Sequence, residues 1–399
     1  MLKFDVYFCN RHKMVEWSQK VDAYGQTQSK NNLHLISYRG KTTSIPPEAE
    51  KETMKSPITG KTMKLTREKR TVSYRKEPFD IVFHCYTCED SGETFTTTAL
   101  DELNMLQVHS LYRSKHRLPF PEDIKRIRDK YGLPATKMSE ILGLGINTYR
   151  NYEAGEMPAL SNARLIQLAD DEEEFIKLIG LCDTISPSAR ETIIQKAQKR
   201  LFENQSRIGE RYITEYIFGK SPGDQFSGFT RPDLEKITEM VVFFSDRLKP
   251  WKTALNKLLF YSDFAMFNQS VRSISGLRYR AIMLGPVPEN YDSLYEYIRN
   301  RGDVAIENQL FPDGQIGEHL FPDSQIGEQF VPIKNRPFNP DHFTSTELSV
   351  MEKVCDHFKN KTAKAMVDIS HREKAWASNH QDSSMIDYSY AFELTGLPG

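Results

Sequence analysis

The stretch from Ala135 to Gly155, ATKMSEILGLGINTYRNYEAG, decides the fold of the middle of the chain. Its first half spaces apolar side chains as the inner face of a short helix, namely Met138, Ile141 and Leu142. Gly143 suits the left-handed backbone angle of a tight turn. Tyr149 and Tyr152 in the second half share one face and would dock a second helix on the first. The pattern therefore predicts a helix-turn-helix.

The second helix of this motif would present polar side chains to solvent: Asn147, Thr148, Arg150 and Asn151. Side chains of these types hydrogen-bond base edges and phosphates in a major groove. Lys137 stands where the first helix would cross a DNA backbone. The same pattern also suits an ordinary solvated surface, because short helices with a polar outer face are common. We expect DNA binding through these five residues.

Charge supports this expectation only locally. Over the 399 residues, 53 Lys and Arg nearly balance 54 Asp and Glu, so nucleic-acid affinity must come from a local patch. Upstream of the motif, basic residues outnumber the acidic residues Glu122, Asp123 and Asp129, and would supply such a patch: Arg113, Lys115, Arg117, Lys125, Arg126, Arg128 and Lys130.

Length and composition describe an ordinary multidomain protein. At roughly 100–200 residues per domain, the chain should hold two to four domains, and 39% hydrophobic residues exclude wholesale disorder. No stretch approaches the ~18 apolar residues of a membrane span, and the first residues lack the apolar core of a signal peptide. Five scattered cysteines suit a reducing compartment. We therefore expect a cytoplasmic protein with no membrane partner.

Periodicity divides the chain into five segments. Residues 1–53 are polar and should form a loosely ordered extension. Residues 54–110 alternate apolar and polar positions and predict a small β-rich module, and residues 111–182 hold five short helical patterns that predict a compact bundle. Residues 183–229 read as a helical connector and hinge, and residues 230–399 as a mainly α domain with a short β element. The expected fold class is multidomain α+β.

The helix-turn-helix stretch resembles the Cro/repressor (Xre) family, and more closely the MqsA or YgiT-type antitoxins. In that resemblance Asn147 takes the position of a base-reading Asn. Two positions depart from the pattern: Ala135 stands where Gln often opens the first helix, and Asn151 stands where Arg often makes the second base contact, with Arg150 beside it. The operator sequence therefore cannot be carried over.

The same resemblance covers the β-rich module and implies a four-cysteine zinc fold of two Cys-x-x-Cys knuckles. Cys85 and Cys88 have this spacing, and two thiolates three positions apart on a turn can meet one tetrahedral ion. The partner knuckle aligns with Ser56 to Gly60, where neutral hydroxyls are poor zinc ligands. Two readings stay open: a metal-free relic with no cofactor, and a zinc site completed from the extension by Cys9 and His12.

The C-terminal segment carries a second constellation in three blocks: Lys257-Leu-Leu-Phe-Tyr261-Ser-Asp263, Gly276-Leu-Arg-Tyr279 and Gly285-Pro-Val-Pro-Glu-Asn-Tyr291. The residues alone predict a buried aromatic helix, a short strand with alternating Tyr279, Ala281 and Met283, and a stiff Pro-x-Pro turn before another helix. These blocks, echoed by a later His371 and Trp376, resemble the Panacea or SocA-like domain.

This resemblance implies an antitoxin domain that binds and neutralises a protein toxin, coupled to DNA binding for autoregulation. The residues that carry the signature are the candidate toxin contacts: Tyr261, Asp263, Arg278, Tyr279, Pro286, Pro288, Tyr291, His371 and Trp376. The aromatic members also suit a packed core. We expect a homodimer or a toxin–antitoxin hetero-oligomer that places two recognition helices in successive major grooves.

Three other functions remain open. The chain could act as an adaptor that delivers a client to a protease, as a transcriptional regulator with no toxin partner, or as a hydrolase that uses His371. No phosphate loop, paired metalloprotease histidines or nucleophile elbow supports an enzyme, so we expect no catalysis. A two-copy repeat of period ten at residues 310–329 predicts either a duplicated surface loop or a partner-binding arm.

Overall fold

The computed structural model of the chain describes residues 7–10, 13–16, 53–206, 208–220, 223–310 and 326–398. The chain forms two compact units, Met1–Ile208 and Gly209–Gly399, which are described separately. The predicted connector 183–229 is therefore divided between the two units. Most of the predicted extension 1–53, and residues 311–325 within the tandem repeat, lie outside the described residues.

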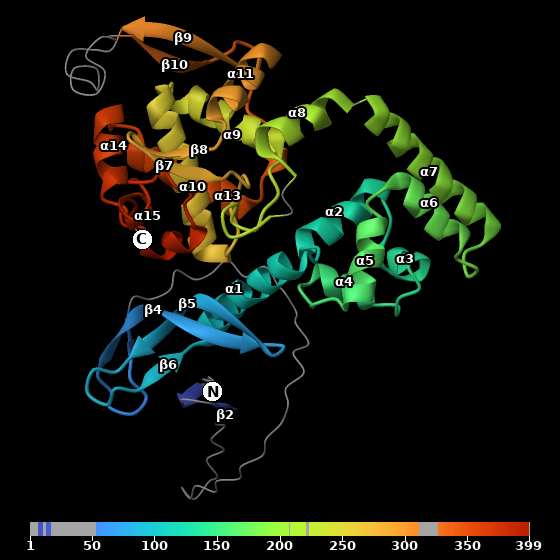
Figure 1. Cartoon of the computed structure of the whole chain (residues 1–399), viewed down its shortest axis with the longest axis horizontal. Coiled ribbons are helices and arrows are strands. Elements are labelled where there is room, and N and C mark those ends of the chain that lie inside the picture. Colours follow the sequence, from blue (N-terminus) through green and yellow to red (C-terminus); the bar gives the residue numbers. More distant parts are fainter. Residues whose placement is uncertain are drawn as a thin grey trace, which may run out of the picture. The chain divides into compact units, whose positions relative to one another are not determined.

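An antiparallel sheet in the order β2-β1-β6-β5-β4-β3 opens the first unit (Figure 1). Its strands are β1 (Tyr7–Asn10), β2 (Lys13–Glu16), β3 (Thr53–Lys55), β4 (Thr62–Tyr74), β5 (Glu77–Thr87) and β6 (Thr94–Thr96). Arg75 and Lys76 join β4 to β5, and both have positive φ angles, which match the twist of a two-residue hairpin turn. The strands predicted from the period-two alternation are present.

Strand β6 pairs with only the last two residues of β5 and leaves the rest of that edge open. Helix α1 (Thr98–His116) lies along this open edge. The buried side-chain amide of Asn104 bonds both the N–H and the C=O of His84, at 2.8 and 3.0 Å. Gln107 does the same for Val82, at 3.0 and 2.8 Å. The two amides take the place of a neighbouring strand and so cover an otherwise open edge.

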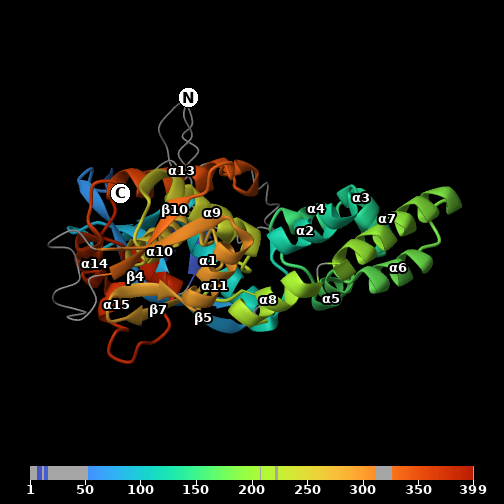
Figure 2. The same ribbon diagram turned by 90° about the horizontal axis from the view of Figure 1, so that it is seen from above.

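A helical bundle follows α1 (Figure 2) and contains the five short helices that the sequence predicts. Its members are α2 (Pro121–Tyr131), α3 (Ala135–Ile141), α4 (Thr148–Glu153), α5 (Leu160–Leu168), α6 (Glu172–Gly180) and the longer α7 (Pro187–Ser206). Apolar side chains from all of them form one core, in which the rings of Tyr131 and Phe175 stack with centroids 3.9 Å apart.

Helix α10 (Lys252–Ser270) is the core of the second unit, because every side chain from Ala254 to Phe264 is buried. Around it lie α8 (Ile208–Phe218), α9 (Leu234–Leu248), α11 (Tyr291–Arg301), α13 (Ser345–Phe358), α14 (Ala363–His371) and α15 (Lys374–Ala377). Short 3-10 turns span Pro340–His342 and Tyr388–Glu393. Two hairpins complete the unit: β7 (Tyr279–Ile282) with β8 (Gly285–Pro288), and β9 (Val304–Leu310) with β10 (Ile326–Pro332).

One detail of the second unit differs from expectation. Tyr279 and Ala281 are fully buried as the predicted alternation requires, but Met283 is 69% exposed. The reason is that β7 ends at Ile282, so Met283 lies in the turn to β8 rather than on the inner face of a strand. The multidomain α+β fold class is confirmed. No helix among the described residues is long and apolar enough to cross a membrane.

Candidate functional site

The predicted helix-turn-helix is formed by α3 and α4, and buried tyrosines fix α4 in place. Tyr149 has no exposed surface, and its hydroxyl donates a hydrogen bond of 2.8 Å to the carbonyl oxygen of Ile124 in α2. Its backbone N–H also donates to the hydroxyl of Ser139 in α3, at 3.1 Å. Helix α4 is thus tied to both earlier helices through one residue, while Tyr152 packs beside it. The docking role predicted for both tyrosines is confirmed.

The opposite face of α4 is open to solvent. Asn147, Arg150 and Asn151 are exposed and Thr148 is half-buried, so this face presents a row of hydrogen-bonding side chains. Ile146, which precedes them in the turn, is 75% exposed. An exposed apolar side chain at this place can contact a thymine methyl group, whereas the amides and the guanidinium suit base edges and phosphates. Ile146 was not predicted from the sequence, because one apolar residue in a turn carries no periodic signal.

Lys137 is placed differently from the four residues of α4. It is half-buried, and its ammonium group forms an ion pair of 2.6 Å with Glu140 one turn later in α3. Glu140 also accepts a hydrogen bond of 2.9 Å from the hydroxyl of Thr184, which precedes α7. The lysine therefore neutralises a carboxylate within the bundle, and its charge is only partly available to a phosphate.

The expected basic patch upstream of the motif is largely neutralised, which corrects the charge argument. Arg113 is buried and bonds backbone carbonyl groups. Most of the others pair with a carboxylate. The partners come from β5, from α2 itself, from α4 and from the segment that starts α6: Lys115 with Glu77, Lys125 with Asp129, Arg126 with Asp170, Arg128 with Glu153 and Lys130 with Glu172. Arg117 stays exposed after α1. The exposed face of α4 is therefore stronger support for DNA binding than the basic patch is.

The structure does not bring Cys85 and Cys88 together. The hydroxyl of Thr66, opposite Cys85 in the sheet, lies 3.3 Å from the Cys85 sulfur. The sulfur of Cys88 instead lies 3.5 Å from the hydroxyl of Thr59 and packs beside Tyr86. Cys85 lies within β5 with its side chain on the face of Thr66, whereas Cys88 follows the strand and its side chain joins the cluster of Tyr86 on the other face. These two sulfurs cannot meet one ion in this arrangement.

The side chains of the other two candidate metal ligands are not among those that the structure describes. Cys9 belongs to β1, for which only the strand pairing is described, and His12 lies outside the described residues. Among the described residues, no group of three or more His, Cys, Asp and Glu side chains could hold a metal ion. Hydrogen bonds from Ser91 and Thr59 lower the pKa of the Cys88 thiol to about 6.

In the second unit, Asp263 is a structural carboxylate. It is fully buried in α10 and accepts hydrogen bonds from the N–H groups of Ile274 and Ser275, at 2.9 and 2.8 Å, and from the hydroxyl of Tyr279, at 2.7 Å. Burial raises the pKa of Asp263 to about 6, although these hydrogen bonds oppose the shift. The carboxylate thereby fixes the chain that leads into β7.

Lys257 is a second buried ionisable side chain on α10, and no role was predicted for it from the sequence. Its ammonium group donates a hydrogen bond of 2.9 Å to the carbonyl oxygen of Pro286, and burial lowers the pKa of the amine to about 7. Gly285 lies so close that a Cβ atom there would be 2.7 Å from Lys257 Cε and 2.5 Å from the hydroxyl of Ser370. The feature of the sequence that could have indicated this role is a lysine within an otherwise apolar helical run.

Aromatic stacking organises the later part of the signature. His371 stacks on Trp376 with ring centroids 3.8 Å apart, and Trp376 stacks on His380 at 4.2 Å. The indole N–H of Trp376 donates a hydrogen bond of 2.7 Å to the carbonyl oxygen of Ile282, which joins α15 to the β7–β8 hairpin. All three rings are half-buried.

The candidate toxin contacts therefore fall into two groups. Tyr261, Asp263, Tyr279, Pro286 and Pro288 are buried, so a partner docked on this surface does not touch them, and they act as core residues instead. Tyr291, His371 and Trp376 keep partly exposed side chains. So does Arg278, which pairs with Asp224 at 2.6 Å.

A hydrolase that uses His371 would need a carboxylate paired with it, and neither Glu373, two positions later, nor Asp263 is placed to serve. The carboxylate of Glu373 accepts hydrogen bonds from the hydroxyl of Tyr261, at 3.1 Å, and from the N–H groups of Thr395 and Gly396, at 3.0 and 2.6 Å. It is thus directed at the C-terminal tail, whereas the ring of His371 faces Trp376. Asp263 is engaged elsewhere in the core.

Two known protein families match the chain, each over a different region. The family described as "Antitoxin SocA-like, Panacea domain" matches residues 255–377. The family described as "Antitoxin component of bacterial toxin-antitoxin system, MqsA" matches residues 54–179. No curated protein and no solved structure matches the chain. The two resemblances predicted from the sequence motifs are confirmed.

Proposed function

We propose that this chain is an antitoxin that neutralises a protein toxin and represses its own operon. The proposal is supported by its MqsA-like N-terminal region and its C-terminal Panacea domain. In this proposal it acts by covering surfaces and catalyses no reaction. The exposed face of α4 binds operator DNA, and the second unit binds the toxin.

The observation that carries the DNA-binding half is the exposed face of α4 on a fixed scaffold. Asn147, Arg150 and Asn151 are exposed, whereas Tyr149 between them is fully buried and bonded to two other helices. A rigid helix that presents amide and guanidinium groups loses little conformational entropy when it enters a major groove. A dimer would place two such helices one helical turn apart on a pseudo-palindromic site.

The toxin-binding half rests on the Panacea match at residues 255–377 and on the surface that the core supports. The buried signature residues hold α10, the β7–β8 hairpin and α15 in one arrangement. The partly exposed residues on that scaffold are the candidates for contact: Arg278, Tyr291, His371 and Trp376. Aromatic and arginine side chains are the types that most often dominate protein interfaces.

The test uses the full-length chain and the product of the adjacent reading frame, expressed together and apart. Neutralisation predicts that the purified pair forms a stoichiometric complex and that co-expression restores growth. A double variant, Asn147→Ala with Arg150→Ala, should lose binding to its own promoter fragment but keep growth rescue. Lys177→Ala, at an exposed position of α6, serves as the matched control and should keep both activities.

Three outcomes would contradict this proposal. Loss of rescue together with DNA binding in the folded double variant would refute the division into two functions. Rescue that works only when a protease is present, with no inhibition by purified components, would establish the adaptor. A chain that binds its promoter but forms no complex with the neighbouring product would be a regulator without a toxin.

A further inference from the structure

Two turns at one end of the β-rich module share the same backbone construction. The first runs from Ser56 to Lys61 and the second from Cys88 to Glu93. In each turn the first residue donates its N–H to the carbonyl of the sixth, at 2.7 and 2.9 Å, and the fifth donates to the carbonyl of the first, at 2.9 and 2.8 Å. The fifth residue is a glycine with φ near +70° in both, Gly60 and Gly92. The turns are therefore structural equivalents of each other.

The side chains extend this equivalence. The hydroxyl of Ser56 accepts hydrogen bonds from the N–H groups two and three residues later, at 3.2 and 3.1 Å. The sulfur of Cys88 accepts hydrogen bonds from the N–H groups at the same two positions of its own turn. In both turns the sixth residue donates its N–H to the hydroxyl of the fourth, Thr59 or Ser91, at 3.4 Å. Ser56 thus corresponds to Cys88, and Thr59 to Ser91.

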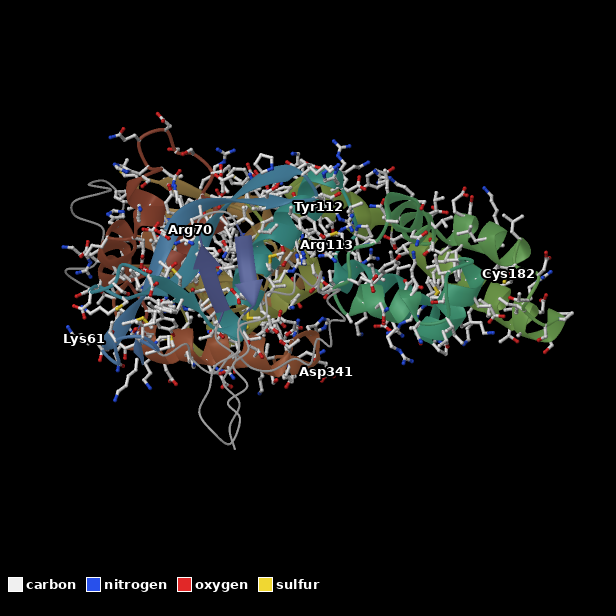
Figure 3. All side chains as sticks on the ribbon, turned by 90° about the horizontal axis from the view of Figure 1, so that it is seen from below. Lys61, Arg70, Tyr112, Arg113, Cys182 and Asp341 are labelled. Atoms are coloured by element: carbon white, nitrogen blue, oxygen red, sulfur yellow. The ribbon has the colours of Figure 1, made fainter. Side chains whose placement is uncertain are left out.

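The two turns face each other. The Thr59 hydroxyl lies 3.5 Å from the Cys88 sulfur, and the Ser91 hydroxyl hydrogen-bonds the same sulfur. Ser56 and Cys88 are buried, with 3% and 2% of their surface exposed. An ion pair of 2.6 Å between Lys61 and Asp90 joins the turns on their outer side, and Figure 3 shows Lys61 at the end of the sheet remote from Tyr112.

A pair of turns with side chains at the first and fourth positions and glycine at the fifth is the geometry with which two knuckles hold one zinc ion. The resemblance to MqsA-type antitoxins implies such an ion. The donor set here does not fit it, because three of the four positions carry neutral hydroxyls, which bind zinc poorly, and only one carries a thiol. Cys85 cannot supply a second thiolate to this donor set, since its side chain lies on the other face of the strand.

We propose that the ligand-equivalent positions of this chain are Ser56, Thr59, Cys88 and Ser91, and that a hydrogen-bonded cluster of hydroxyls and one thiol replaces zinc there. The cluster joins β3 and β4 to β5 and β6 without a metal. Cys85 is not part of it, although its spacing from Cys88 in the sequence imitates a zinc knuckle.

The test introduces thiols into the full-length chain under a thiol-free reductant and counts bound zinc. The wild type should contain none. The triple variant Ser56→Cys, Thr59→Cys and Ser91→Cys should bind about one zinc ion per chain, and its cobalt derivative should show the absorption of a tetrahedral four-thiolate site. Adding Cys85→Ser to the triple variant should leave zinc content and cobalt spectrum unchanged.

The matched control is the double variant Ser56→Cys with Thr59→Cys. It also has four cysteines in the module if Cys85 is counted, but it should not give the four-thiolate spectrum. Zinc in the wild-type protein would overturn the proposal, as would a triple variant that stays folded by circular dichroism without gaining zinc. Two outcomes would assign the site to Cys85 instead. One is a four-thiolate spectrum in the double variant, and the other is loss of that spectrum from the triple variant when Cys85→Ser is added.

Discussion

Arg113 at the end of α1 donates a hydrogen bond of 2.9 Å to the carbonyl oxygen of Gly155, just beyond the end of helix α4. A second bond of 3.2 Å reaches the carbonyl of Glu156. The side chain is buried, and Tyr112 beside it packs in the cluster that includes Tyr74 of the sheet. Figure 3 labels both Tyr112 and Arg113. The β-rich module and helix α4 are thus linked through α1.

Arg113→Met should weaken DNA binding although Arg113 is not a DNA contact. Removing a buried charged donor leaves two carbonyl groups without their partner and should lower the free energy of unfolding by about 2–3 kcal/mol. We expect a lower melting temperature and reduced affinity for the promoter fragment, measured by fluorescence anisotropy. Lys115→Met is the control, since its exposed ion pair with Glu77 is worth at most about 1 kcal/mol. Equal effects of both variants would contradict this link.

Tyr149→Phe should separate stability from base recognition. The change removes only the hydroxyl that bonds Ile124, so the melting temperature should fall by the equivalent of about 1 kcal/mol. Below the transition the face of α4 is intact, and affinity for DNA at low temperature should match the wild type. Tyr212→Phe, at a residue that is 69% exposed, should change neither quantity. A large loss of DNA affinity in the folded Tyr149 variant would show that the hydroxyl does more than anchor α4.

Glu373→Gln should loosen the C-terminal tail. The carboxylate accepts hydrogen bonds from Thr395 and Gly396, and an amide cannot accept on both of its terminal atoms, so one N–H group would face a donor. We expect a loss of about 1–3 kcal/mol of stability and faster hydrogen exchange or proteolysis after Leu394. Glu393→Gln removes only an exposed ion pair with Lys374 and should have little effect. Unchanged exchange in the Glu373 variant would mean that the tail is held by other contacts.

Lys257→Met should flatten the dependence of stability on alkaline pH. Burial lowers the pKa of this amine from 10.5 to about 7, so the folded state favours the neutral form. The stability that this preference contributes is present above pH 10.5 and is lost as the pH falls towards 7. The associated slope is on the order of 1.4 kcal/mol per pH unit. Urea unfolding between pH 7 and 10 should show this slope in the wild type but not in the variant.

Lys353→Met on the exposed face of α13 is the matched control, and its pH profile should follow the wild type. If Lys257→Met also followed the wild-type profile throughout this range, the buried amine would carry no pH-dependent stability. A gain of stability at pH 7 is expected from the apolar replacement, because a buried charge without an acidic partner is costly.

Local patterns were sufficient for most elements. The spacing of Met138, Ile141 and Leu142 predicted α3, and the paired tyrosines predicted how α4 docks. The alternation of apolar residues predicted the strands of the β-rich module. These features could be read from the sequence because each depends on a periodicity of a few residues along one element, which decides the face that is buried.

Other features depended on contacts that no local pattern encodes. Asn104 and Gln107 cover the edge of β5 only because β6 is too short to do so. Arg126, Arg128 and Lys130 of α2 are neutralised by carboxylates from the turn before α6, from α4 and from α6. In the second unit, signature residues that suggested an interface are packed around α10, since hydrophobic and aromatic character is the same in a core and in a binding site.

The sequence by itself determined the order of the modules, the helix-turn-helix and the two antitoxin-type regions. Only the tertiary structure decided which residues meet. Thr59 and Cys88 are 29 positions apart, and the pairing of β4 with β5 brings them to 3.5 Å, while the same pairing turns Cys85 to the opposite face. Spacing along a chain reports neighbours on one element, whereas the register between strands selects the neighbours across space.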